Sequence, residues 1–269
     1  PRAFLQGPVA PNSMEQLFSA EKTPSVVQAF EAWMARGISA SSLNELTSMP
    51  DRFYQKRLIR VKEEDEVEEQ VSAMVMGNLI HKGLEKVYES HVGKPITNID
   101  VDQWTEQAYE AGFNYLIEVE RYSKNALTQG RNLLTLEICK KMIRQFLHYD
   151  ARRATQGALI LKGVETKLDF EMQHPTLKLP MKFTGVVDRL EVYDNAFIIW
   201  DYKSGAIGQS DLSLSGLGDL WKGSKGKPLQ ILLYAWLLWK KELVTHPFPW
   251  YSGMFKLQSG QPEHLLRGA

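Results

Sequence analysis

The sequence predicts a mixed α/β protein, in which a β-sheet core follows a helical region. Up to residue 157 the apolar residues recur mostly with a helical period, and from Ala158 onward they form β-branched and aromatic runs separated by turn residues. The chain then returns to a helical pattern and to one more apolar run. An order of helices, strands, helix and strand is typical of a sheet with helices packed on its faces.

The composition is that of a folded, globular chain. Of its 269 residues, 43% are hydrophobic and 24% are charged, and the formal net charge is zero. Neutrality gives no general attraction for nucleic acid, so local basic patches would have to hold such a partner. The single cysteine, Cys139, excludes an internal disulfide and a cysteine-based metal site, and it suits the cytoplasm. We expect no membrane partner, because the sequence has no bilayer-length apolar run and no signal peptide.

Three parts are expected along the chain: a lead-in over residues 1–37, a helical region over 38–157 and a core over 158–269. The first residue is proline rather than methionine, which we interpret as the mark of a piece of a longer protein. Within the lead-in, residues 25–36 have helical periodicity that ends at Gly37.

The helical region is expected to begin with a short helix capped by Ser41 or Ser42, and Pro50 marks a break after it. The charged run at residues 62–70 is interpreted as a solvated helix face or loop. Three longer helices are expected to follow, over residues 74–89, 101–121 and 127–151.

The core is expected to open with strand segments over residues 158–170 and 181–202, the second folding back at Asp194-Asn195. The connection at residues 173–180 does not fix the register between the two segments. A Gly/Ser-rich loop then leads to the last two elements, a helix over residues 228–242 and a strand over 251–257.

The turn at Asp194-Asn195 sets the geometry of the expected site. Both residue types tolerate positive φ, as a two-residue hairpin loop requires. A loop of this length places Asp188 opposite Asp201, and the Cβ atoms of such partners lie about 5 Å apart. Lys203, two residues beyond Asp201, projects from the same face. Two carboxylates and one ammonium group should therefore meet at the strand ends farthest from the turn.

This arrangement favours a bound cation. Facing carboxylates repel each other, and burial makes the repulsion worse. A divalent cation between them replaces repulsion with coordination, and hard oxygen ligands suit Mg²⁺ or Mn²⁺. The alternative interpretation is that Lys203 only neutralises two aspartates at strand ends.

Four further residues support the metal interpretation when they are taken together. Glu165 is a carboxylate on the preceding strand, and His81 lies among apolar residues of a helix. Gln230 and Tyr234 are four residues apart, so they share one face of the helix that follows the strands. Each of these residues alone would be an ordinary surface or packing residue.

Taken in their order along the chain, the residues named above and the segments around them resemble the RecB-type branch of the PD-(D/E)XK nuclease superfamily. Its segments are GNLIHKGLE, GVVDRLEVY, FIIWDYKSG and PLQILLYAWLL. It is most similar to the C-terminal nuclease domain of AddB-like helicase–nuclease subunits, over about residues 38–257. The resemblance implies a restriction-endonuclease-like fold, which is a mixed β-sheet core flanked by helices, with an N-terminal helical region.

The resemblance also implies roles for single residues. One or two Mg²⁺ or Mn²⁺ ions would be bound by His81, Asp188 and Asp201. Lys203 is the motif lysine, Gln230 and Tyr234 support the site or contact DNA, and Glu165 matches an acidic residue often found on the first core strand. An imidazole ligand shifts the preference towards Mn²⁺.

The sequence departs from the AddB-like pattern in its cysteines. Many AddB-like nucleases hold an iron–sulfur cluster with four cysteines, the first of which precedes a proline in the lead-in helix. Here Met49 precedes Pro50, and Cys139 is the only cysteine. No iron–sulfur cluster is therefore expected.

The segment WKGSKGKP is a candidate for contact with DNA. Trp221 can stack on a base, and phosphates can be held by Lys222, Lys225 and Lys227. The alternative is a flexible, solvated loop.

The expected function is that of a metal-dependent DNA exonuclease, acting on single-stranded ends within a helicase–nuclease repair enzyme. The alternatives are a non-catalytic DNA-binding or scaffold domain on the same fold, and a stand-alone endonuclease. A glycosidase with paired carboxylates fits the adjacent lysine poorly.

Overall fold

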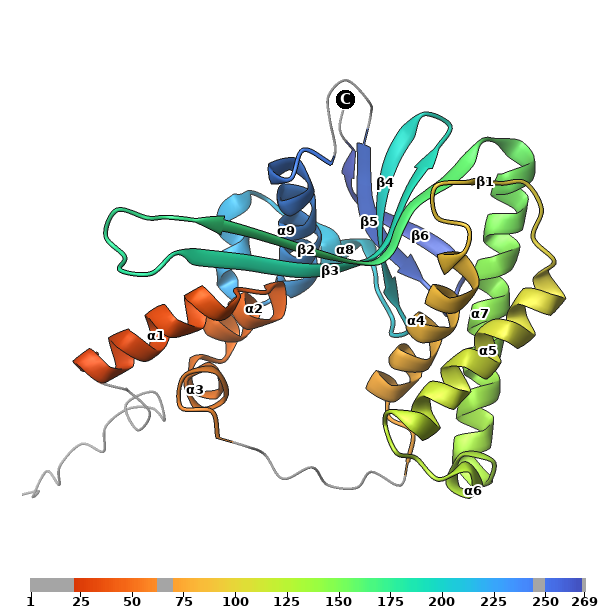
Figure 1. The fold of residues 1–269 in the computed structure, drawn as a ribbon, viewed down its shortest axis with the longest axis horizontal. Coiled ribbons are helices and arrows are strands. Elements are labelled where there is room, and N and C mark those ends of the chain that lie inside the picture. The colour runs from red at the N-terminus through yellow and green to blue at the C-terminus, as the bar shows by residue number, and fades with distance from the viewer. Residues whose placement is uncertain (1–21, 62–69, 244–249, 268–269) are drawn as a thin grey trace, which may run out of the picture.

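The computed structural model describes residues 22–61, 70–243 and 250–267. Its centre is a six-stranded sheet whose strands lie in chain order (Figure 1). The strands are β1 (Pro95–Ile96), β2 (Leu159–Met172), β3 (Met181–Tyr193), β4 (Ala196–Lys203), β5 (Trp250–Lys256) and β6 (Gln261–Arg267). β4 and β5 are parallel and the other neighbouring pairs are antiparallel, so the predicted mixed α/β fold is confirmed.

Most of the helices precede β2 in the sequence, and others connect β4 to β5. The longer ones are α1 (Pro24–Arg36), α2 (Ala40–Ser48), α4 (Ala73–Glu89), α5 (Val101–Glu118), α7 (Gly130–Gln156) and α9 (Gly226–Lys240). The shorter ones are α3 (Pro50–Phe53), η2 (Tyr54–Leu58), α6 (Lys124–Leu127), α8 (Gln209–Leu212) and η3 (Leu217–Lys222). The crossover from β4 to β5 runs through α9, because parallel neighbours cannot be joined by a tight turn. Within the described part of the chain, no helix is both long enough and apolar enough to cross a membrane.

Helices cover both faces of the sheet. Successive residues of β4 show this, because side chains along a strand point alternately to the two faces. Ile198 and Trp200 join the apolar cluster formed by α4, α5 and α7, whereas Ile199 joins the cluster that contains Leu233 and Leu237 of α9. In Figure 1, α4, α5 and α7 form one group, and α9 lies apart from them beside β2 and β3.

α4 and α5 approach each other closely because glycines face the contact. A Cβ atom at Gly83 would lie 2.4 Å from the backbone oxygen of Ala108, and one at Gly112 would lie 2.3 Å from that of Leu79. A larger residue at either position would push the helices apart. α4 carries His81, so this contact helps to fix where the histidine stands relative to the sheet.

The hairpin between β3 and β4 has the predicted register. Tyr193 faces Ala196 across the turn, and the pairing continues as far as Arg189 and Trp200. The two turn residues have φ values of 49° and 62°, as a two-residue loop of this kind requires.

β3 and β4 separate at Asp188, which lies one residue beyond the last paired position. The first half of β3 continues with β2 as a two-stranded arm, which extends away from the rest of the sheet (Figure 1). Beyond the separation, Ile38 forms a parallel bridge with Phe183. The separation therefore opens one edge of β3 close to the expected site.

Some details of the predicted elements are wrong. Ser39, and not Ser41 or Ser42, caps α2: its hydroxyl accepts the backbone N–H of Ser42, whose own hydroxyl accepts the N–H of Ser39. The sequence prediction also misses β1 and β6. β6 contains Pro262, which lowers the strand signal but is tolerated on an edge strand. The charged run predicted at residues 62–70 lies outside the described residues except for Gln70, and so do residues 1–21 of the lead-in.

Candidate metal and catalytic site

Asp188 lies where β3 and β4 separate, and its position follows from that separation. Its side chain is buried. One carboxylate oxygen accepts the backbone N–H of Tyr202 at 2.6 Å. The carboxylate thus satisfies a strand N–H just beyond the last paired position of the two strands. This contact anchors Asp188 and leaves its other oxygen free to face α4.

Glu165 of β2 lies next to Asp188 of β3. The paired positions pass from Val164 with Arg189 directly to Thr166 with Val187, omitting Glu165 and Asp188 between them. Glu165 has a φ of 44°, in the left-handed region that few residues other than glycine adopt. Strain of this kind is concentrated at functional sites, where the surrounding structure holds it in place.

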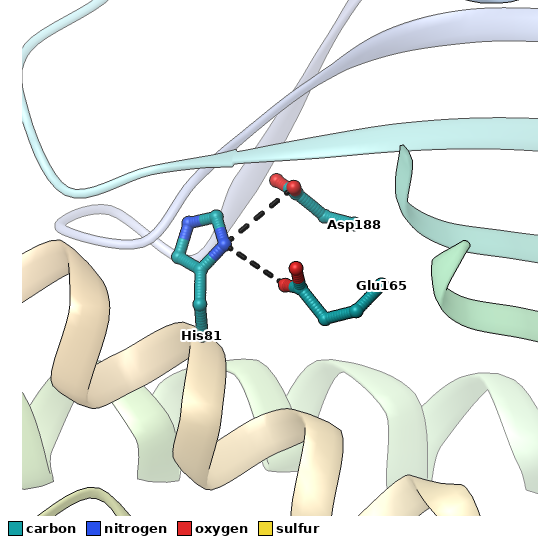
Figure 2. A group of neighbouring side chains, drawn as sticks. All are labelled: His81, Glu165 and Asp188. Carbon is teal, nitrogen blue, oxygen red and sulfur yellow. Dashed lines mark hydrogen bonds and ion pairs between the residues drawn. The ribbon is translucent and has the colours of Figure 1, made fainter. Parts of the chain in front are cut away.

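His81 of α4 faces both carboxylates (Figure 2). Its Nδ1 atom lies 3.2 Å from Oε1 of Glu165 and 3.5 Å from Oδ1 of Asp188. Its Nε2 atom lies 3.3 Å from the backbone oxygen of Tyr202. When Nε2 donates to that carbonyl, Nδ1 can offer its lone pair towards the carboxylates, which is the usual arrangement of a histidine that binds a metal.

These three side chains form a group suited to a cation. One ligand atom from each of His81, Glu165 and Asp188 lies within 4.8 Å of the others. The donor set of two carboxylates and one imidazole fits a divalent ion that accepts oxygen and nitrogen ligands. The group includes Glu165, for which the sequence did not predict the face of the sheet.

Asp201 and Lys203 form the other half of the site. Nζ of Lys203 lies 2.7 Å from Oδ2 of Asp201 and donates to the side-chain oxygen of Gln230 at 3.2 Å. The amide nitrogen of Gln230 donates to the hydroxyl of Tyr234 at 2.8 Å. The structure therefore places the predicted lysine, glutamine and tyrosine in one hydrogen-bonded chain that begins at Asp201.

Gly185 allows Tyr234 to reach this position. A Cβ atom at Gly185 would lie 2.8 Å from the tyrosine ring, so the ring packs directly on the backbone of β3. Burial raises the pKa of Tyr234, and the nearby Asp201 raises it further. The hydroxyl therefore stays protonated and serves as a hydrogen-bond partner for Gln230.

The carboxylates of the site outnumber its cations. Burial, together with the neighbouring charges of Asp201 and Glu165, raises the pKa of Asp188 to about 7 against the opposing effect of His81. Burial lowers the pKa of His81, but Asp188 and Glu165 outweigh it and raise the pKa to about 9. In the metal-free protein the imidazole is therefore protonated at neutral pH and partly balances the carboxylates.

Lys203 keeps its charge. Burial lowers its pKa, but Asp201 outweighs that effect and the net shift is upward. An ammonium group that stays protonated is a poor general base, so Lys203 is suited to neutralising negative charge on a substrate.

The predicted DNA-contacting segment lies outside the acidic group, and its lysines have partners within the protein. Lys222 binds Asp219, Lys225 donates to the backbone oxygen of Ser210, and Lys227 binds Asp211. The segment packs closely against α2, because a Cβ atom at Gly223 would lie 2.8 Å from the backbone of Ser48 in that helix. Trp221 is 62% exposed, so its ring is open to a base.

Sequence reasoning missed a second group of buried charges, which begins at the residue of β3 that follows Asp188 and also contacts α4. It consists of Asp150 and Arg153 of α7 and Arg189 and Glu191 of β3. The signal was present in the sequence, because Arg189 and Glu191 occupy alternate positions of one strand, on either side of Leu190, and so share one face. Cys139 also lies buried in α7, where burial raises the pKa of its thiol to about 12.

Comparison with known proteins identifies the class of this fold and site. A model of the PD-(D/E)XK nuclease superfamily matches residues 37–265. Because the match covers most of the chain, the protein belongs to this superfamily, whose members are nucleases that hydrolyse phosphodiester bonds with the aid of divalent metal ions.

Two curated relatives are also similar to part of the chain. An uncharacterized protein of Rickettsia bellii (strain RML369-C) is 24% identical over 173 residues. An uncharacterized protein of Rickettsia conorii (strain ATCC VR-613 / Malish 7) is 24% identical over 171 residues. Each match covers 63% of this chain but only 19% of the relative, so the matched part spans about a fifth of the length of these proteins.

Proposed function

We propose that this chain is a metal-dependent DNA exonuclease module. The observation that carries the proposal is the convergence of His81, Glu165 and Asp188 within 4.8 Å, beside the ion pair of Asp201 and Lys203. Membership of the nuclease superfamily makes phosphodiester hydrolysis the reaction, and DNA is the substrate we infer.

In this proposal the metal is held by Asp188, Asp201 and His81, with Glu165 as a further carboxylate ligand. A divalent ion bound there would lower the pKa of a coordinated water and polarise the scissile phosphate. Asp188 is oriented by the N–H of Tyr202, and His81 by the carbonyl of the same residue. Tyr202 thus aligns two ligands through its backbone alone.

Lys203 would act on the substrate rather than on the metal. Asp201 and Gln230 fix its ammonium group at the edge of the acidic cluster, and its raised pKa keeps it charged. A fixed positive charge next to the scissile phosphate would neutralise the charge that grows on its oxygens during attack. Gln230 and Tyr234 would act as positioning residues, because Gln230 accepts a hydrogen bond from Lys203 and Tyr234 in turn holds Gln230.

The wider context is also part of the proposal. We infer that the module works on single-stranded DNA ends within a helicase–nuclease enzyme of recombinational repair. The resemblance to AddB-like subunits supports this inference, and the matched relatives are several times longer than the matched region. A scaffold without catalysis is disfavoured because Asp188, Asp201 and Lys203 are all present, Asp188 lies beside His81, and Lys203 pairs with Asp201.

The test is a cleavage assay on linear single-stranded DNA with Mg²⁺ or Mn²⁺. The wild type should degrade the strand, with Mn²⁺ supporting at least comparable activity, and Asp201→Asn and Lys203→Ala should lose it. A circular strand run in parallel should survive if an end is required. Binding without metal-dependent degradation in the wild type would favour the scaffold alternative and contradict the proposal.

A further inference from the structure

A cleft of about 920 Å³ opens beside Lys203, outside the acidic group. It follows the edge of β3 at residues 184–186, between the N-terminal end of α2 and the start of α9. The cleft exists because β4 leaves β3 at Asp188, while the bridge from Ile38 reaches only Phe183. Between these points no described strand pairs with that edge of β3.

The walls of the cleft carry more positive than negative charge. Its lining includes four lysines, Lys167, Lys182, Lys203 and Lys227, and two aspartates, Asp169 and Asp211. Two of the lysines are already engaged, since Lys203 binds Asp201 and Lys227 binds Asp211. The remaining two lie on the arm formed by β2 and β3.

Lys167 and Lys182 are available to a ligand. Lys167 is exposed and makes no ion pair within the described part of the chain. Lys182 lies 3.6 Å from Asp169 and 3.8 Å from Glu171, which are long contacts at a partly exposed position and therefore weak. Asp169 has a closer partner in Lys241, at 2.7 Å.

The cleft and the acidic group have opposite electrostatic character and meet at Lys203. A strand of nucleic acid needs a cation wherever its phosphates approach carboxylates, whereas lysines bind its phosphates directly. We propose that this cleft binds the phosphates next to the scissile bond of a single DNA strand, through Lys167 and Lys182. The proposal rests on the proposed nuclease function, and it assigns the phosphate contacts to the arm of β2 and β3 rather than to Trp221, Lys222 and Lys225, which do not line the cleft.

The size of the cleft selects a single strand. A volume near 920 Å³ is that of a site for a small molecule, so it holds a few nucleotides and not a duplex. A flexible strand can bend into the space between α2 and α9, whereas a paired helix would have to sit above it. Ends that are already unpaired should therefore enter directly.

The test compares the full chain with Lys167→Ala and Lys182→Ala, singly and together. Lys178→Ala is the matched control, because Lys178 is an exposed lysine near the tip of the same arm and does not line the cleft. Binding of a labelled oligothymidine strand is measured in EDTA across a salt series. Steady-state hydrolysis of that strand and of the p-nitrophenyl ester of thymidine phosphate is measured with Mn²⁺.

Each cleft variant should bind the strand more weakly and lower the slope of log K against log salt by about 0.7, the value for one lost phosphate contact on a single strand. KM for the strand should rise with kcat unchanged, and hydrolysis of the short ester should not change. Cleft variants that bind like Lys178→Ala, or a blunt duplex that binds the wild type as tightly as the strand, would overturn the proposal.

The two proposals fail in different ways. A wild type that shows the lysine-dependent salt slope but hydrolyses nothing with Mg²⁺ or Mn²⁺ would contradict the nuclease function and support the cleft as a strand-binding site. A wild type that degrades the strand while both cleft variants match Lys178→Ala would leave the nuclease function standing and remove the role of the cleft.

Discussion

Asp188 and Arg189 are consecutive buried residues of β3, yet they belong to two charged clusters with opposite properties. The first cluster, around His81, Glu165, Asp188 and Asp201, has more carboxylates than cations, and the pKa of Asp188 is raised to about 7 by burial and by Asp201 and Glu165. In the second, burial alone would raise the pKa of Glu191, but two guanidinium groups outweigh it and lower the pKa to about 2.

The charges of the second cluster balance one another, since it contains two carboxylates and two guanidinium groups. Arg189 lies between Glu191 and Asp150, each at 2.6 Å, and Arg153 binds the same two carboxylates. The indole N–H of Trp200 donates to Glu191 at 2.9 Å, and the Tyr88 hydroxyl donates to Asp150 at 2.6 Å. Two carboxylates therefore face two guanidinium groups, and the charges of the cluster cancel. Together with Tyr88 and Trp200, these groups join α4, α7, β3 and β4.

The difference shows that buried charges on one strand can either stabilise the fold or provide a site for a cation. Where cations and carboxylates match, a buried cluster ties helices to the sheet and can be broken only at a large cost in stability. Where carboxylates are in surplus, the cluster lowers stability in the absence of a ligand and gains when a cation binds. Substitutions in each cluster should therefore have separable effects on activity and on stability.

The largest effect is expected for Asp188→Asn. Loss of a metal ligand should reduce cleavage by about a thousandfold or more, which is about 4 kcal/mol in the activation barrier. Asparagine can still accept the N–H of Tyr202, so the fold should survive. In EDTA the variant should melt at a higher temperature than the wild type, because a buried carboxylate with a raised pKa destabilises the fold when it ionises.

The matched control for this change is Asp102→Asn, in which an aspartate that is 78% exposed on α5 loses its charge. Cleavage and melting temperature should both stay close to those of the wild type. Mn²⁺ should raise the melting temperature of the wild type and of the control but not that of Asp188→Asn. A cleaving Asp188→Asn variant would show that the metal is held elsewhere.

The next effect is expected for Glu191→Gln, in the balanced cluster. It should lower the free energy of unfolding by about 3 kcal/mol, because two buried guanidinium groups lose an ionised partner. Chemical denaturation at pH 7 measures this loss. The shift in melting temperature caused by Mn²⁺ should remain, since the metal ligands are untouched. Loss of that shift would mean that the two clusters act as one.

The same variant gives a pH dependence with a definite sign. Glu191 has a pKa of about 2 in the folded chain against a usual value of 4.5, so its ionised form is favoured by folding. Its contribution to stability is present above pH 4.5 and is lost as the pH falls towards 2. The difference in unfolding free energy between wild type and Glu191→Gln should therefore be constant near neutral pH and shrink between pH 4.5 and 2. A difference that grows on acidification would contradict this assignment.

A smaller effect on activity is expected for Gln230→Ala. Gln230 contacts Lys203 and Tyr234 rather than the carboxylates, so its loss should let the ammonium group move without disturbing the metal ligands. Cleavage should fall by about 10-fold to 100-fold, as for other residues that orient an active group. The Mn²⁺-induced shift in melting temperature should be unchanged, and Gln230→Glu, which can still accept from Lys203, should recover part of the activity.

Local sequence patterns predicted the parts of the molecule that depend on near neighbours. The hairpin register followed from a two-residue turn, and the alignment of Gln230 with Tyr234 followed from a spacing of four on a helix. The mixed α/β fold followed from the change in period at Ala158. In each case the relevant partners are close in sequence, so spacing alone fixes their geometry.

The parts that sequence did not predict depend on distant contacts. Glu165 meets His81 across 84 residues of chain, and its side-chain direction depends on a bulge near Gly163 and on its own left-handed backbone. The cleft depends on β4 leaving β3, and the residues around Asp188 carry no sign of where the ladder stops. The Arg153 contact with Glu191 needs α7 to be docked on the sheet first.

The smallest effect is a gain in stability, expected for Glu165→Gly. At a φ of 44°, glycine avoids the steric cost of about 1 kcal/mol that a side chain pays in the left-handed region, so the metal-free variant should be more stable by about that amount. Glu165→Gln is the matched control, because it removes the same charge but keeps the strained backbone. The excess stability of the glycine variant over the glutamine variant in EDTA measures the strain, while both should bind Mn²⁺ more weakly than the wild type. If the two variants unfold at the same denaturant concentration, the backbone at Glu165 is not strained, and the acidic cluster opposes folding through its charges alone.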